Sequence, residues 1–168
     1  MNTLQLLDIL KLGESEDLEC KKSKNEVPKS LWDTYSAMAN TNGGIILLGI
    51  DEVDNELIIT GVENVDNVIK DFWSILNGEK VNKNILKNED LEVIDIDNKS
   101  VIKINIPRAY YKDKPIFING NPYKGTYKRN YEGDYKCHED EVKAMIRDAS
   151  EQGGDSIILE GYDMCDID

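Results

Sequence analysis

Residues 37–52, AMANTNGGIILLGIDE, constrain the fold more than any other part of the chain. The Asn-Gly-Gly at 42–44 tolerates left-handed backbone angles, so it predicts the end of a helix followed by a turn. Residues 45–50 hold no polar side chain, which predicts a strand buried on both faces. Asp51 then comes at the end of that strand, where it could belong to a site or open the turn Asp-Glu-Val-Asp-Asn.

Periodic patterns around this stretch predict helices and strands in a mixed order. Apolar residues at helical spacing predict helices over residues 3–12, 28–40, 65–77 and 139–150. Alternating or continuous apolar runs predict strands over residues 18–22, 57–61, 91–96, 101–106, 116–118 and 123–129. We therefore expect an α+β (α/β) fold, with a single mixed β-sheet and β-hairpins packed by three to four helices.

The pattern changes after residue 150. Residues 151–168 hold six acidic side chains and no basic one. We expect one domain over residues 1–150 and an acidic linker over residues 151–168 that leads toward a missing C-terminal region. No apolar run is long enough to span a membrane, and the first residues lack a signal-peptide pattern, so we expect a cytoplasmic protein.

Charge is distributed unevenly along the chain. The net charge is −13, which argues against non-specific nucleic-acid binding by the whole surface. Residues 99–136, however, hold nine Lys or Arg against three Asp or Glu, together with seven aromatic residues. Basic residues between aromatic ones can hold phosphates and stack bases. An amphipathic β-region with packed Tyr rings and solvated Lys side chains explains the same pattern, and both interpretations stay open.

Three scattered cysteines and a single histidine, His138, fit neither a zinc pattern nor a disulfide framework. We expect ordinary reduced thiols and no certain cofactor.

Three motifs in order carry a resemblance to a known family. They are GESEDLECK at residues 13–21, AMANTNGGIILLGIDE at 37–52 and KPIFINGNPYKGTYKRN at 114–130. Together they resemble the Schlafen AlbA-type (AlbA_2) domain, which in bacteria carries a DNA-binding label and occurs at the N-terminus of transcriptional-regulator or ATP-binding proteins. Two departures stand out: Cys20 replaces a usual Phe, and residues 124–129 are less regular than the usual valine-arginine run.

The resemblance implies a nucleic-acid-binding (DNA or RNA) domain of a bacterial transcriptional-regulator-like protein. The basic region supplies the contacts. We expect phosphate contacts from Lys103, Arg108, Lys112, Lys114, Lys124, Lys128 and Arg129, with Tyr123 and Tyr127 as stacking residues.

The resemblance also implies an alternative, a metal-dependent endoribonuclease of the tRNA or rRNA type. Carried over by position, its three carboxylates are Glu14, Glu19 and Asp51, with Lys21 beside them. Carboxylates suit Mg²⁺ or Mn²⁺, which would polarise a phosphate. This site requires the strand at 18–22 to lie beside the strand at 45–50. A structural role for all three acids explains the same residues: Glu14 at the strand entry, Glu19 paired with Lys21 or Lys22, and Asp51 in a turn.

ATP binding is less well supported, because the chain has no phosphate-loop pattern and Gly43-Gly44 precedes a strand instead of opening a helix. Oligomeric state stays open. A homodimer could join two basic surfaces into one groove, but nothing in the sequence requires it.

Overall fold

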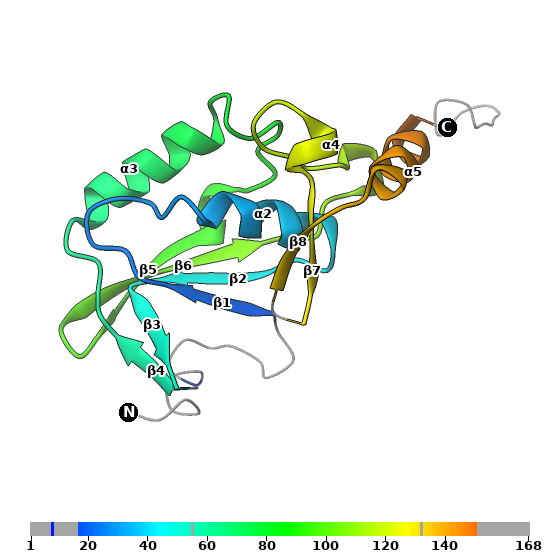
Figure 1. Ribbon diagram of the computed structural model, residues 1–168. Coiled ribbons are helices and arrows are strands. Elements are labelled where there is room, and N and C mark those ends of the chain that lie inside the picture. The colour runs from blue at the N-terminus through cyan, green and yellow to red at the C-terminus, as the bar shows by residue number, and fades with distance from the viewer. Residues whose placement is uncertain (1–7, 9–16, 55, 132, 151–168) are drawn as a thin grey trace.

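The computed structural model describes residues 8, 17–54, 56–131 and 133–150 (Figure 1). At its centre lies a four-stranded sheet in the order β1-β2-β6-β5. The strands are β1 (Leu18–Lys21), β2 (Gly44–Leu48), β5 (Leu91–Ile96) and β6 (Lys99–Ile106). The sheet is mixed, because β1 runs parallel to β2 whereas β6 runs antiparallel to both of its neighbours. The expected α+β class is confirmed.

Two hairpins stand apart from this sheet. They are β3 (Ile50–Val53) with β4 (Glu56–Ile59), and β7 (Tyr127–Asn130) with β8 (Gly133–Lys136). The first exists because Gly49 adopts φ +96°, a backbone angle that favours glycine, and this breaks the apolar run after Leu48. The prediction of one continuous strand over residues 45–50 was therefore wrong. Asp51 lies inside β3, opposite Ile58, and not at a strand end.

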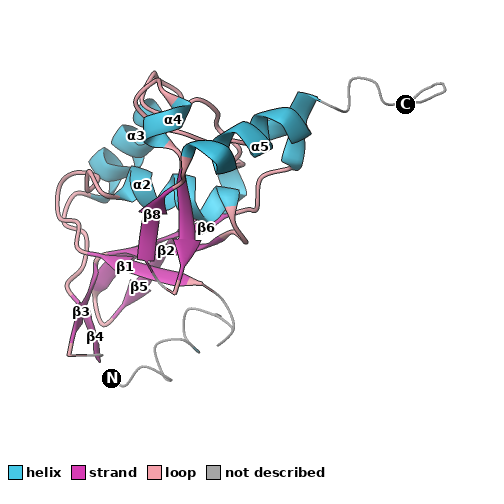
Figure 2. Ribbon diagram, turned by 45° about the vertical axis from the view of Figure 1, so that its right-hand side comes forward, coloured by secondary structure: helices cyan, strands magenta, loops and turns pink. Residues whose placement is uncertain are grey.

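The α-helices within residues 17–150 are α2 (Leu31–Asn40), α3 (Val65–Leu76), α4 (Pro122–Gly125) and α5 (Glu139–Ser150). Two short 3₁₀ helices, η1 (Asn88–Asp90) and η2 (Tyr111–Asp113), lie between them. Figure 2 shows the α-helices above the sheet, with the β3–β4 hairpin below it. Pro28 does not begin α2, because the helix starts three residues later. The predicted strand over 123–129 is instead α4 followed by β7, and residues 116–118 make only isolated bridges. The predicted helix over 3–12, apart from residue 8, and the segment 151–168 lie outside the described residues.

The sheet buries apolar side chains on both faces, as the composition of β2 predicts. Ile46 and Leu48 belong to the larger core with α2 and α3. Ile45 and Leu47 belong to a second core, where residues of the β3–β4 hairpin pack. None of the helices in the described part of the chain is long and apolar enough to cross a membrane.

Helix α2 is buried on nearly every side, including its polar residues. Ser36 donates to the carbonyl of Ile116 at 2.7 Å, and its hydroxyl accepts from the backbone N–H of Tyr127 at 3.0 Å. Asn40 accepts from the N–H of Ile116 at 2.9 Å and donates to carbonyls of Ile116 and Tyr127. Because buried polar groups must be hydrogen-bonded, these side chains fix the segment that leads into β7 against the helix.

Candidate functional site

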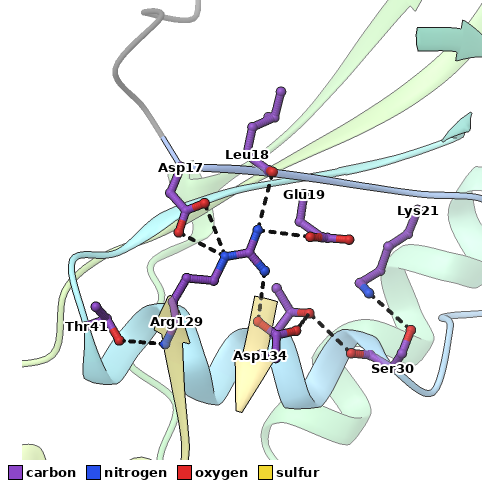
Figure 3. A network of polar contacts seen from close by, with 9 residues as sticks. Asp17, Leu18, Glu19, Lys21, Ser30, Thr41, Arg129 and Asp134 are labelled. Atoms are coloured by element: carbon purple, nitrogen blue, oxygen red, sulfur yellow. Dashed lines mark hydrogen bonds and ion pairs between the residues drawn. The ribbon is translucent and has the colours of Figure 1, made fainter. Parts of the chain in front are cut away.

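The guanidinium of Arg129 is the centre of a buried polar network between β1 and the β7–β8 hairpin (Figure 3). Its Nε donates to both carboxylate oxygens of Asp17, at 3.1 and 3.0 Å. One terminal nitrogen donates to Glu19 Oε1 at 2.9 Å, and the other donates to Asp134 Oδ1 at 2.8 Å. Only 3% of the Arg129 side chain is exposed. The network therefore ties together segments more than a hundred residues apart in the sequence.

The pairing register of the strands determines where Glu19, Lys21 and Arg129 lie. Glu19 lies opposite Ile46 in the parallel β1–β2 pair, and Ile46 belongs to the core under α2. Side chains alternate along a strand, so Glu19 and Lys21 share this face. In the β7–β8 hairpin Arg129 lies directly opposite Asp134.

Helix α2 and the residue that follows it make two further contacts with the network. Thr34 donates to the second oxygen of Asp134 at 2.6 Å, and the backbone N–H of Arg129 donates to the hydroxyl of Thr41 at 2.9 Å. At the edge of the network, Lys21 donates to the Ser30 hydroxyl at 3.1 Å.

Three carboxylates surround one guanidinium, so the network has an excess of negative charge. Burial disfavours the Arg129 cation, but its hydrogen bonds to Asp134 and Glu19 outweigh this effect and raise the pKa of the guanidinium. Burial, and after it the Asp134 charge, raises the pKa of Asp33 nearby. Burial, followed by Asp33, likewise raises the pKa of Tyr127. An added phosphate would meet net repulsion in this region.

Of the three carboxylates predicted to bind a metal, the structure describes Glu19 and Asp51. Glu14 lies outside the described residues. The backbone N–H of Gly49 donates to the carbonyl of Lys21 at 2.9 Å, so β3 starts next to the end of β1. Burial, followed by the charges of Glu52 and Glu19, raises the pKa of the Cys20 thiol to about 12. Within the described part of the chain, no three acidic, histidine or cysteine side chains come close enough to hold a metal ion.

Several predicted phosphate contacts have protein partners. Arg129 is enclosed by its carboxylates, and this differs from the exposed role expected of it. Lys128 donates to both carboxylate oxygens of Glu141 at 3.0 and 2.9 Å. The ring of Tyr127 packs against the main core. The β7 residues thus have structural partners, which the local basic pattern could not reveal.

The other predicted contacts are spread over the surface. Lys103 lies opposite Leu47, a residue of the second core, so it points to the β3–β4 side of the sheet. Tyr123 and Lys124 lie exposed on α4. None of these three residues lines the small pocket formed by residues 108–111 and 114, which follow β6.

That segment forms a compact basic surface, here named the Arg108 patch: Arg108, Tyr110, Tyr111, Lys112 and Lys114. The Tyr110 and Tyr111 ring centroids lie 4.6 Å apart, and 59% of Tyr110 is exposed. Burial, followed by the Arg108 charge, lowers the pKa of Lys114. Among the described residues, no acidic side chain forms an ion pair with Arg108, Lys112 or Lys114.

A larger pocket, not predicted from the sequence, adjoins this patch at Arg108. It has a volume of about 740 Å³ and lies where the turn after α2, the end of β6 and the tip of the β7–β8 hairpin meet. Three asparagines, Asn42, Asn105 and Asn130, line it with Tyr131, and we name it the asparagine pocket. Gly43 allows this convergence, since a Cβ there would lie 2.6 Å from the carbonyl oxygen of Ile106. No single motif unites these residues, so only the fold reveals the pocket.

The geometry defines a class: an α+β domain whose parallel β1–β2 pair and β7–β8 hairpin are joined by an arginine–carboxylate network. The chain belongs to the Schlafen AlbA_2 family, because the model of that family matches residues 14–138.

Two solved structures have a similar fold. The chain is similar to the N-terminal domain of a RecG-related protein from Nitrosomonas europaea, whose name relates it to an ATP-dependent DNA helicase. The TM-score is 0.55 at 25% identity, with 82% of this chain and 94% of that chain covered. The fold is also similar to the DIP2311 protein from Corynebacterium diphtheriae, with a TM-score of 0.54 at 16% identity, over 86% of this chain and 31% of that chain. No curated protein sequence matches the chain.

Proposed function

We propose that this domain binds nucleic acid, DNA or RNA, through the Arg108 patch, as part of a transcriptional-regulator-like protein. Family membership points to a nucleic-acid-related role. The observation that carries the proposal is the patch itself: three cations without acidic partners beside two adjacent tyrosines. Cations bind phosphates, and exposed aromatic rings stack on bases.

The proposal narrows the set of contacts expected from the sequence. Arg108, Lys112 and Lys114 are the phosphate contacts, and Tyr110 replaces Tyr127 as a stacking residue because 59% of it is exposed. Lys128 and Arg129 serve the fold instead. A local binding surface also fits the net charge of −13, since most of the remaining surface repels phosphates.

The test is binding of fluorescently labelled oligonucleotides, measured by anisotropy between roughly 50 and 200 mM salt. Affinity should fall with salt, and the Arg108→Ala/Lys114→Ala variant should reduce the slope by about two units, one for each lost contact. Lys70→Ala is the matched control, because Lys70 is an exposed residue of α3 outside the patch. Salt-independent binding, or equal slopes for both variants, would contradict the proposal.

A nuclease is the second candidate, and one observation favours it. Strand β1 is the parallel neighbour of β2, which brings Glu19 and Lys21 beside the strand that leads to Asp51. The described acids do not by themselves form a metal site, so this candidate depends on Glu14, which lies outside the described residues.

Labelled tRNA and single-stranded DNA, incubated with Mg²⁺ or Mn²⁺ and with EDTA, test this candidate. Metal-dependent cleavage that is lost in Glu19→Ala/Asp51→Ala supports it. Absence of cleavage, with binding intact, leaves the domain as a binding module only.

A further inference from the structure

The asparagine pocket is built from three segments that are distant in sequence. Residues 41–44 form one wall, residues 105–108 form the second, and Arg129, Asn130 and Tyr131 form the third. Its volume of about 740 Å³ falls within the range of roughly 300 to 1,000 Å³ that is typical of small-molecule sites.

The polar lining of the pocket suits a nucleobase. Asn42 and Asn130 are exposed and make no side-chain hydrogen bond to the described residues. Asn105 donates to Asp90 at 3.3 Å through its amide nitrogen, which leaves its oxygen available as an acceptor. Amide groups both donate and accept, so together they can bond the edge of a base.

The charged residues of the pocket favour a phosphate at Arg108. Arg108 lines the pocket and has no acidic partner among the described residues. Asp17 also lines it, but its carboxylate already binds Arg129. A phosphate is therefore attracted to Arg108 and repelled by Asp17.

Tyr131 provides a stacking surface at the rim. Its side chain is 96% exposed and its backbone has φ +50°, so the turn holds an aromatic ring away from the core. Among the described residues no other aromatic ring pairs with it, so its faces are open to a stacked base.

We propose that the asparagine pocket binds one unpaired nucleotide of a single-stranded nucleic acid, with its base against Tyr131 and its phosphate at Arg108. The inference rests on the proposed nucleic-acid binding and specifies its substrate class. A base within a duplex cannot enter such a pocket, because its edge is paired and its faces are stacked. The small basic surface also matches a short single strand better than a duplex, which carries one charge per roughly 1.7 Å of axis.

The experiment compares a labelled single-stranded oligonucleotide with a blunt duplex of the same sequence. Both would be titrated by anisotropy with the full 168-residue chain and with two variants, Tyr131→Ala and Tyr135→Ala. Tyr135 is the matched control, because it is an exposed tyrosine of the same hairpin (55%) that does not line the pocket. A 2-aminopurine base in the single strand reports stacking through its fluorescence.

We expect the single strand to bind at least about tenfold more tightly than the duplex, with 2-aminopurine fluorescence quenched on binding. Tyr131→Ala should weaken single-strand binding about tenfold and abolish the quenching, whereas Tyr135→Ala should change affinity less than about twofold.

Two results overturn the inference but leave the proposed function standing: equal binding of duplex and single strand, or equal affinities for the two tyrosine variants. Absence of binding to either nucleic acid overturns both. Because Tyr131 is exposed, its replacement by Ala should not unfold the protein, so unfolding would not explain weaker binding by this variant. Circular dichroism of both variants checks this.

Discussion

Arg129 and Arg108 lie within one region of the sequence that is rich in basic residues, yet their environments are opposite. Arg129 is 3% exposed and pairs with three carboxylates, whereas Arg108 is exposed and pairs with none of the described acids. Both residues nevertheless line the asparagine pocket.

The contrast shows that the partners of a cation, and not its position in a basic stretch, decide its role. A buried guanidinium enclosed by carboxylates joins parts of the fold, since its removal leaves unpaired charges. An exposed guanidinium without a partner adds little to folding stability and is available to a ligand. A variant at Arg129 should therefore lower stability, whereas a variant at Arg108 should weaken binding.

The largest expected effect comes from Arg129→Met. This change keeps much of the side-chain volume but leaves Asp17, Glu19 and Asp134 without their common cation. Breaking a buried ion pair on one side costs about 3 to 5 kcal/mol, so the free energy of unfolding in urea should fall by about that amount. Partial exposure of the three acids, 28%, 28% and 18%, favours the lower end.

Arg108→Ala is the control for that measurement and should change the free energy of unfolding by less than about 0.5 kcal/mol. Equal losses of stability at the two positions would contradict the assignment of a structural role to Arg129 and a binding role to Arg108.

The second expected effect is on binding and comes from Arg108→Glu. Charge reversal removes one phosphate contact and places a carboxylate near Lys114, so the salt slope should fall by about one to two units. Stability should stay within about 0.5 kcal/mol of the native protein, because the site is exposed. The measurements are anisotropy titrations and urea unfolding on the same sample. Unchanged affinity would place the binding surface elsewhere.

Much of the fold could be predicted from local patterns. The apolar β2, the amphipathic α3 and α5, and the β5–β6 hairpin all follow from periodicity and turn residues. The break at Gly49 could not be predicted, because an apolar run looks the same whether one strand or two strands use it. α4 was missed since the alternation after Pro122 resembles a strand, although Asn121 caps it by accepting from the N–H of Tyr123.

The candidate site was harder to predict because its contacts are not local. Arg129 meets Asp17 across 112 positions, and no spacing rule connects them. The sequence of α2 could have indicated part of the site, because polar residues along an otherwise apolar helix suggest buried hydrogen bonds. These residues are Thr34, Ser36 and Asn40. The asparagine pocket had no such signal, since isolated asparagines are ordinary turn residues.

The smallest expected effect comes from Glu141→Gln, which tests an ion pair intermediate between the two arginine environments. Glu141 and Lys128 each keep 36% of their side chains exposed. The backbone N–H of His138, followed by Lys128, lowers the pKa of Glu141 below its usual 4.5. Because the folded pKa is the lower one, the charge stabilises the fold above about pH 4.5, and this contribution is lost as pH falls through the folded pKa. The variant should therefore cost less than about 1 kcal/mol at pH 7, and the cost should disappear as pH falls below the folded pKa of Glu141. Urea unfolding of both proteins across this pH range measures the difference. A cost as large as that of Arg129→Met would show that exposure does not separate structural from available cations.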